Sequence, residues 1–201
     1  MKVALKDISH SFTEEAILFH NLTVDLVPNR TYALVGPSGS GKSTLLSIIA
    51  KWLEPVKGEI EYDEIEKVNW VFQNPHGVAN RTVLDHVCLP LLSYGMSREQ
   101  AEKEAKEYLD IFGLNEIKDS LFKELSGGEA QRLMLARGIA SKPNLLLVDE
   151  PTAQLDTKTA MTVSDKLTNL ANKGAIVVIA THDEHTRDAC TDIIDLTHYG
   201  V

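Results

Sequence analysis

The sequence predicts an α/β fold in which helices cover a mostly parallel sheet, and three short apolar runs support this prediction. Residues 31–35, 145–148 and 175–180 are almost wholly apolar, which is typical of parallel strands buried on both faces. The first run is followed by a glycine-rich loop and then by apolar residues at helical spacing. Residues 74–143 look mostly helical, so we expect one domain of 201 residues with a helical insertion in a doubly wound core.

The N-terminal part of the chain is expected to form short strands around the glycine-rich loop. Val3 and Leu5 lie two residues apart, which places both on one face of a first strand. Further strands are expected up to about residue 72. After residue 144 the pattern returns to strand–helix alternation and closes with the apolar residues of 193–196.

Residues 97–112 form the clearest predicted helix. Ser97 and Gln100 have the spacing of a capping box, and Gly113 is a natural helix terminator. Five residues at helical spacing form one apolar face: Ala101, Ala105, Tyr108, Leu109 and Phe112. We expect this face to be core rather than a partner site.

The glycine-rich loop matches the phosphate-binding pattern G-x-x-x-x-G-K-[ST] at every fixed position. Its backbone N–H groups and the start of the following helix form a natural anion site. Lys42 is expected to reach the β- and γ-phosphates, and the Ser43 hydroxyl to bind Mg²⁺. The alternative is a plain Gly/Ser-rich turn. The residues predicted to bind the nucleotide here are Gly36, Pro37, Ser38, Gly39, Ser40, Gly41, Lys42, Ser43 and Thr44.

Two acids, Asp149 and Glu150, follow the apolar run at 145–148 and precede Pro151. Open α/β sheets place their ligand chemistry at the carboxyl ends of strands. One acid alone could be a solvated turn residue, but two at this place predict a catalytic or metal-binding role.

A third pattern, Leu-Ser-Gly-Gly-Glu-Ala-Gln at 125–131, looks by itself like an ordinary helix start with Ser126 as N-cap and Glu129 as capping-box partner. Together with the phosphate loop upstream and the two acids downstream, it resembles the ATP-binding cassette family of transporter subunits. The resemblance covers nearly the whole chain. It implies a RecA-like P-loop NTPase core with a small antiparallel β region at 1–73 and 144–201, and a helical signature subdomain at 74–143.

The resemblance also implies an ATPase that uses ATP and Mg²⁺. Glu150 would polarise the attacking water and His182 would contact the γ-phosphate, while Asp149, Ser43 and Gln73 would hold the metal. Phe12 would stack on adenine, the alternative being an ordinary core phenylalanine. A second subunit, either a copy or a paralogue, would hold the ATP that this chain binds in trans through a further set of residues: Ser126, Gly127, Gly128 and Asp156.

A membrane partner is implied as well. Residues 82–87 and 89–92 resemble the lipoprotein-release and macrolide-export branch at the place where that family contacts its transmembrane permease. The substitution Leu91→Asp is accordingly expected to uncouple the ATPase from its partner. The alternative is that this segment is a buried helix, in which case the variant unfolds.

Composition limits the remaining possibilities. No apolar stretch reaches the roughly 18 residues of a membrane span, and no secretory segment precedes the first strand. We therefore expect a cytoplasmic protein that is peripheral on the membrane through a separate permease. The net charge of -9 argues against a nucleic-acid surface, which needs clustered Lys and Arg.

Two other classes of protein compete with this interpretation. Cassette proteins that act on ribosomes or DNA usually carry two cassettes or long coiled-coil insertions, and neither feature is present in this sequence. A nucleotide-binding regulator that does not hydrolyse ATP could dispense with the base, whereas here Asp149, Glu150 and His182 are all in place.

Overall fold

The computed structural model describes residues 1–13, 17–152, 155 and 157–200. Five parallel strands form the central sheet in the order β5-β6-β7-β3-β8. The strands are β3 (Arg30–Val35), β5 (Val68–Val71), β6 (Leu145–Asp149), β7 (Ile176–Ala180) and β8 (Asp192–Asp195). The predicted α/β fold with a parallel sheet is confirmed.

The strands β6 and β7 are buried at every position, as their continuous apolar runs predict. Successive side chains point to opposite faces of a sheet. Leu146 and Val148 accordingly belong to one hydrophobic core, while Leu145 and Leu147 belong to a second core on the other face. The sheet is therefore covered on both sides.

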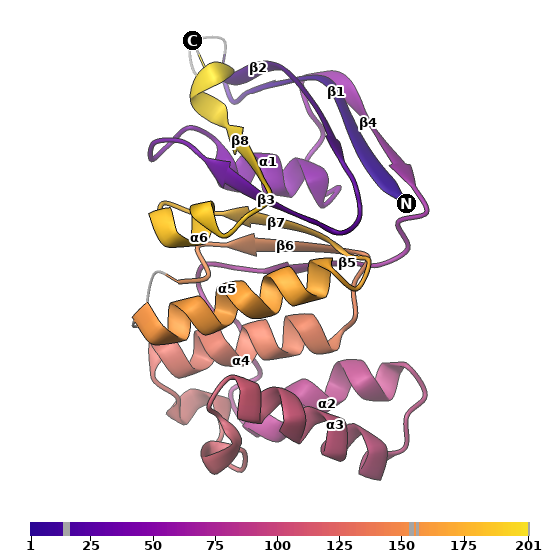
Figure 1. Cartoon of the computed structure of the whole chain (residues 1–201), viewed down its shortest axis with the longest axis vertical. Helices are drawn as coiled ribbons and strands as arrows, with labels where there is room; N and C mark the ends of the chain where they lie inside the picture. Colours follow the sequence, from indigo (N-terminus) through magenta and orange to yellow (C-terminus); the bar gives the residue numbers. More distant parts are fainter. Residues whose placement is uncertain (14–16, 153–154, 156, 201) are drawn as a thin grey trace.

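The layers are visible in Figure 1. On one side of the sheet lie helix α1 and a three-stranded antiparallel sheet of order β2-β1-β4, and on the other lie α4 and α5, with α2 and α3 beyond α4. Their bounds are β1 (Lys2–Ser11), β2 (Ile17–Leu26), β4 (Lys57–Asp63), α1 (Lys42–Ile49), α2 (Val83–Ser93), α3 (Arg98–Ile111), α4 (Gly127–Ala140) and α5 (Thr157–Ala171). The short elements are α6 (Glu184–Asp188) and 3₁₀ turns at Asn115–Ile117, Phe122–Glu124 and Leu196–His198.

Helix α3 confirms the prediction for 97–112. Ser97 caps it through a complete capping box with Gln100. Ala101, Ala105 and Leu109 are fully buried. Together with α2 and α4 these residues share one core with the sheet. The division into a core at 1–73 and 144–201 and a subdomain at 74–143 therefore remains a prediction.

Helix α2 corrects one expectation. Leu91 is completely buried, as are Val83 and Val87, because the apolar face of α2 packs in the core that it shares with α3 and α4. The prediction that Leu91 contacts a partner is wrong, and the alternative of a buried helix is correct for this face. Leu89, by contrast, is 41% exposed and points outward.

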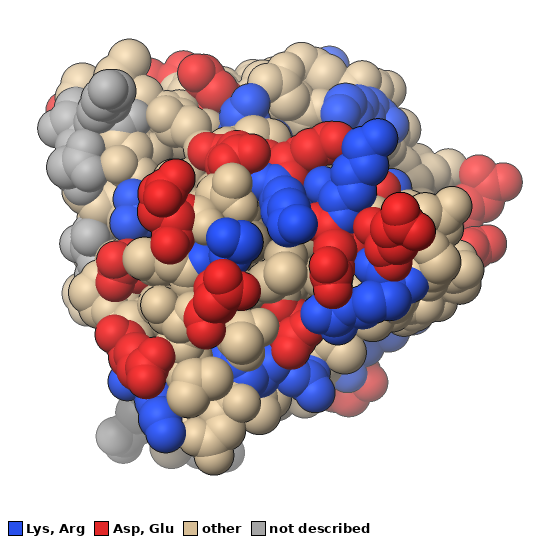
Figure 2. All heavy atoms as spheres, turned by 90° about the horizontal axis from the view of Figure 1, so that it is seen from below, with Lys and Arg blue, Asp and Glu red and all other residues tan. Residues whose placement is uncertain are grey.

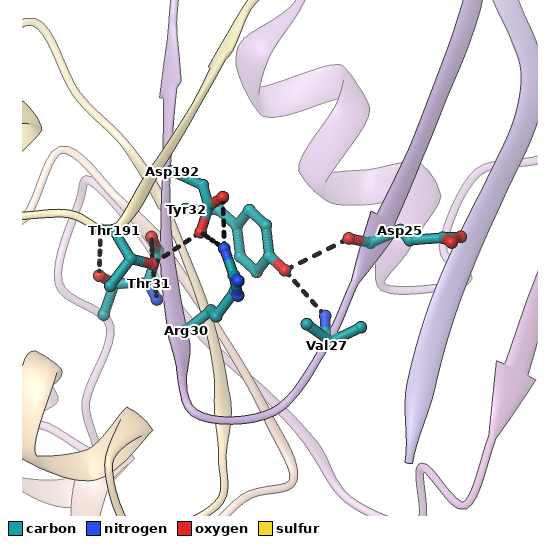
Figure 3. A network of polar contacts seen from close by, with 7 residues as sticks. All are labelled: Asp25, Val27, Arg30, Thr31, Tyr32, Thr191 and Asp192. Carbon is teal, nitrogen blue, oxygen red and sulfur yellow. Dashed lines mark hydrogen bonds and ion pairs between the residues drawn. The ribbon is translucent and has the colours of Figure 1, made fainter.

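A polar network joins the two sheets near the start of β3 (Figure 3). The Tyr32 hydroxyl accepts a hydrogen bond from the Val27 N–H at 2.9 Å and donates to the Asp25 carbonyl at 3.2 Å. Arg30 donates to both carboxylate oxygens of Asp192, at 2.8 and 2.9 Å. The network ties β3 to β8 and to the chain leaving β2, which fixes the strand that leads into the glycine-rich loop.

The charged surface has no large patch of one sign at the α2–α3 end of the molecule. Figure 2 shows Lys and Arg interspersed with Asp and Glu over this face. Among the described residues, no helix combines the length and the apolar character that a bilayer span requires.

Candidate functional site

The glycine-rich loop connects β3 to α1 and lies at the carboxyl end of the sheet. Gly41, the N-cap of α1, has a φ of 95°. A Cβ at this position would also come within 3.0 Å of the Phe19 ring, so glycine is required for both backbone and packing reasons. The loop opens onto a cleft of about 1090 Å³, and Ser38, Gly39, Gly41, Lys42, Ser43 and Thr44 line it.

Lys42 is the cation at the centre of this cleft. Its ammonium donates to the carbonyls of Gly36 at 2.9 Å and Pro37 at 3.2 Å, and lies 2.9 Å from His182 Nε2. An ammonium has donors only, so the His182 nitrogen accepts. Burial lowers the pKa of Lys42, while Glu150 and Asp149 raise it. A positive charge is thus held where a phosphate would enter.

Ser43 and Asp149 form a pair across the cleft. The Ser43 hydroxyl donates to Asp149 Oδ2 at 2.7 Å, and Asp149 is 7% exposed. Such oxygen donors suit Mg²⁺, which is commonly held by one or two protein oxygens together with waters and phosphates rather than by a full protein cage. The described residues contain no cluster of three His, Cys, Asp or Glu side chains that could hold a metal alone.

Glu150 has an unusual backbone for a non-glycine residue, with a φ of 49°. Its N–H donates to the Ala180 carbonyl at 2.9 Å, which holds this conformation in place. Strained backbone of this kind is concentrated at functional sites. The side chain is 12% exposed and lines the cleft.

The Glu150 carboxylate is only partly satisfied. Oε2 accepts from the His182 backbone N–H at 3.3 Å, whereas none of the described residues donates a hydrogen bond to the buried Oε1. Burial raises the pKa of Glu150, and the hydrogen bond from His182 opposes this rise. A buried carboxylate oxygen without a donor, beside a cleft, can accept a proton from water.

His182 lies two residues after the end of β7, as the sequence predicts for a residue at a strand end. Its ring nitrogen Nε2 lies 3.4 Å from Glu150 Oε1, and its side chain is 53% exposed. The same nitrogen is thus close to Lys42 and to Glu150, and His182 lines the cleft.

Phe12 and Gln73 lie at the rim of the same cleft. The Phe12 ring is 66% exposed and packs edge-to-face on the His10 ring, with a centroid separation of 5.1 Å. The alternative that Phe12 is a core phenylalanine is wrong. An exposed ring at the cleft mouth is available for stacking.

Ser126, Gly127 and Gly128 lie away from the residues that line the cleft. The expected helix start is confirmed: Ser126 and Glu129 form a complete capping box at the N-terminus of α4. Hydrogen bonds from Ser126 lower the pKa of Glu129. Asp156, predicted to act in trans, lies outside the described residues, as do Ala153 and Gln154.

Some lining residues were not predicted. Ala160, Met161, Ser164 and Asp165 present one face of α5 to the cleft, and His185 of α6 faces it too. The only local signal for them is helical spacing, which indicates a shared face and not what that face meets.

Comparison with known proteins decides the family. Residues 19–153 match the family model described as ABC transporter. The chain belongs to the ABC transporter family. It is an ATP-binding cassette with the P-loop NTPase fold, and the resemblance inferred from the motifs is confirmed.

The relatives agree with this assignment. The cassette is 30% identical to the lipoprotein-releasing system ATP-binding protein LolD 1 of Rhodopirellula baltica, over 96% of this chain and 93% of that protein. It is 36% identical to an uncharacterised ABC transporter ATP-binding protein of Mycobacterium tuberculosis, over 87% of this chain. The match spans 58% of the length of that mycobacterial relative.

A solved structure has the same fold. A dimeric, post-hydrolysis state of the ATP-binding cassette MJ0796 bound to ADP and Pi superimposes with a TM-score of 0.86 at 31% identity. The match covers 96% of this chain and 93% of that one.

Proposed function

We propose that this cassette binds ATP with Mg²⁺ at a dimer interface and hydrolyses it to ADP and phosphate to drive a separate transmembrane permease. The observation that carries the proposal is the convergence of Lys42, the Ser43–Asp149 pair and Glu150 at one cleft beside a phosphate-type loop. The post-hydrolysis state of the cassette MJ0796 with ADP and Pi supports the same chemistry.

Lys42 and the N-terminus of α1 would bind the phosphates. The ammonium now donates to two loop carbonyls and to His182, and it would exchange some of these acceptors for phosphate oxygens. The unpaired N–H groups at the helix start add donors and a positive dipole end. Phe12 would stack on the base.

Glu150 would act as the general base on the attacking water. Its Oε1 is buried and none of the described residues donates to it, so it can accept a proton from water. Ser43, Asp149 and Gln73 would hold Mg²⁺, whose charge offsets the negative charge of the phosphates. His182 would position the γ-phosphate, because its Nε2 lies close to both Lys42 and Glu150.

The pH dependence of turnover tests the role of Glu150. A base works only when ionised, and burial raises the pKa of this carboxylate above its ordinary 4.5. We expect kcat to fall as the pH decreases, with a midpoint above about 4.5, measured by phosphate release from about pH 9 down to about pH 4. A kcat that stays constant over this whole range would argue against an ionising base.

A second ATP-binding subunit would complete the site. The residues Ser126, Gly127 and Gly128 are solvent-accessible at a helix N-terminus that does not line the cleft of their own chain. Such a helix start binds anions, so it is suited to face the γ-phosphate held by a partner. A second copy of this chain is the partner that we expect first, with a paralogue as the alternative.

The permease would dock beside Gln73. Trp52 is 67% exposed and joins the rings of Trp70 and Phe72, at centroid separations of 5.2 and 5.5 Å. Exposed aromatic clusters are common at protein interfaces. The protein would then be peripheral on the cytoplasmic face of the membrane. The similarity to the LolD relative favours the lipoprotein-release branch of the family.

Capture from membranes tests the transporter role. The tagged Glu150→Gln chain is purified with ATP and Mg²⁺ from detergent-solubilised native membranes, and mass spectrometry identifies what accompanies it. We expect an integral membrane protein in near-stoichiometric amount with ATP and much less without nucleotide. Recovery of ribosomes, nucleic acid or soluble proteins alone would contradict the transport assignment.

A further inference from the structure

A second pocket of about 620 Å³ lies far from the nucleotide cleft along the strands. Asn144 directly precedes β6 and Ala175 directly precedes β7, and both line this pocket. It is therefore built at the amino ends of strands whose carboxyl ends carry Asp149 and His182. Its volume lies within the range of about 300–1,000 Å³ that is typical of small-molecule sites.

The floor of this pocket is apolar and comes from the ends of three helices. Tyr108, Ile111 and Phe112 belong to the end of α3, whereas Ile139 and Leu170 belong to the ends of α4 and α5. Phe112 and Ile139 are buried. Tyr108 is partly buried, and burial together with the neighbouring Glu104 raises its pKa to about 12.

The rim of the pocket is positively charged. Lys142, Lys166 and Lys173 line the pocket, whereas none of the described lining residues is Asp or Glu. Lys142 pairs with Glu104 at 2.8 Å. Within the described part of the chain, Lys166 and Lys173 have no carboxylate at ion-pair distance. In a chain of net charge -9, this convergence of lysines over an apolar floor favours an anion with an apolar body.

We propose that this pocket binds a small amphiphilic carboxylate, with its apolar chain or ring on the floor and its carboxylate at Lys166 and Lys173. Both the apolar floor and the lysines are needed for binding. Exposed ion pairs contribute little in water, so the lysines alone would bind weakly, and a ligand without charge would leave the lysines that border the floor unpaired. An occupant would touch α3 as well as α5 and the start of β7. Binding would thus stabilise the packing of the helical segment against the sheet, since a ligand favours the state that it binds.

Decanoate is a suitable probe, because it combines a carboxylate with an apolar chain. Two-dimensional ¹H–¹⁵N NMR spectra of the nucleotide-free protein would be recorded during titration with decanoate, with decanol and with inorganic phosphate. We expect saturable shifts for decanoate at residues 108–112 and 166–175. Decanol, which lacks the charge, should bind at least about 10-fold more weakly, and phosphate should leave these residues unchanged.

Charge reversal gives the matched test. The double variant Lys166→Glu with Lys173→Glu should weaken decanoate binding at least about 10-fold, with an unchanged far-UV circular dichroism spectrum. The control Lys57→Glu with Lys103→Glu alters two exposed lysines that do not line the pocket, and should bind like the wild type.

Three results would overturn the proposal: shifts that do not saturate or that lie elsewhere, decanol binding as tightly as decanoate, or full binding by the Lys166–Lys173 double variant. Equal binding of phosphate would indicate a simple anion site instead. Because these titrations use no ATP, their outcome is independent of the nucleotide chemistry.

Discussion

Glu150→Gln is expected to lower the turnover of ATP by about 10²- to 10⁴-fold, the contribution of a well-placed general base. The amide keeps the size of the side chain and can still accept from the His182 N–H, but it cannot accept a proton from water. Lys42 and the glycine-rich loop are untouched. Phosphate release measures turnover, and equilibrium dialysis with labelled ATP measures binding, which should change by less than about 3-fold.

A control separates this effect from loss of charge in general. Glu184→Gln removes a carboxylate from the exposed first turn of α6, two residues after His182. This variant should hydrolyse ATP at nearly the wild-type rate. Equal turnover by Glu150→Gln and the wild type would remove Glu150 from the role of base.

Leu91→Asp is expected to abolish folding rather than to uncouple a partner. Leu91 is fully buried in the core shared by α2, α3 and α4. Truncating a buried leucine costs about 2–5 kcal/mol, and an unpaired carboxylate in an apolar core adds a further penalty. Because domains are stable by only about 5–15 kcal/mol, the folded population should be largely lost.

Leu89→Asp is the matched control on the same helix. Leu89 is 41% exposed, and surface substitutions usually change stability by less than about 0.5 kcal/mol. Circular dichroism during urea unfolding compares the two variants with the wild type. A cooperative transition of Leu91→Asp at the wild-type urea concentration would contradict the buried placement of this residue.

The glycine-rich loop and its place between a strand and a helix could be predicted because its parts are local in sequence. The glycine-rich loop, Lys42 and Ser43 occupy consecutive positions between a strand and a helix. The place of Asp149 and His182 follows from a general rule, since parallel strands align their carboxyl ends. The helix caps at Ser97 and Ser126 could also be predicted from the sequence, because a capping box needs only four residues.

The features that the sequence did not predict depend on packing between segments that are distant in the chain. The apolar spacing of α2 cannot tell a core face from a docking face, and only the contacts with α3 and α4 decide that Leu91 is core. The face of α5 that lines the cleft was missed for the same reason. Nothing in the sequence indicates the positive φ of Glu150, which depends on a hydrogen bond to Ala180 in a neighbouring strand.

The mass of the Glu150→Gln protein in solution tests the two-chain nucleotide site most directly. Light scattering coupled to size exclusion should give one chain, 22.2 kDa, without nucleotide and twice that mass with ATP and Mg²⁺. Adding Ser126→Arg should abolish the ATP-dependent doubling, whereas Ser97→Arg, which disrupts the same kind of cap on α3, should preserve it. A protein that binds ATP and keeps the mass of one chain would contradict the proposed site between two copies.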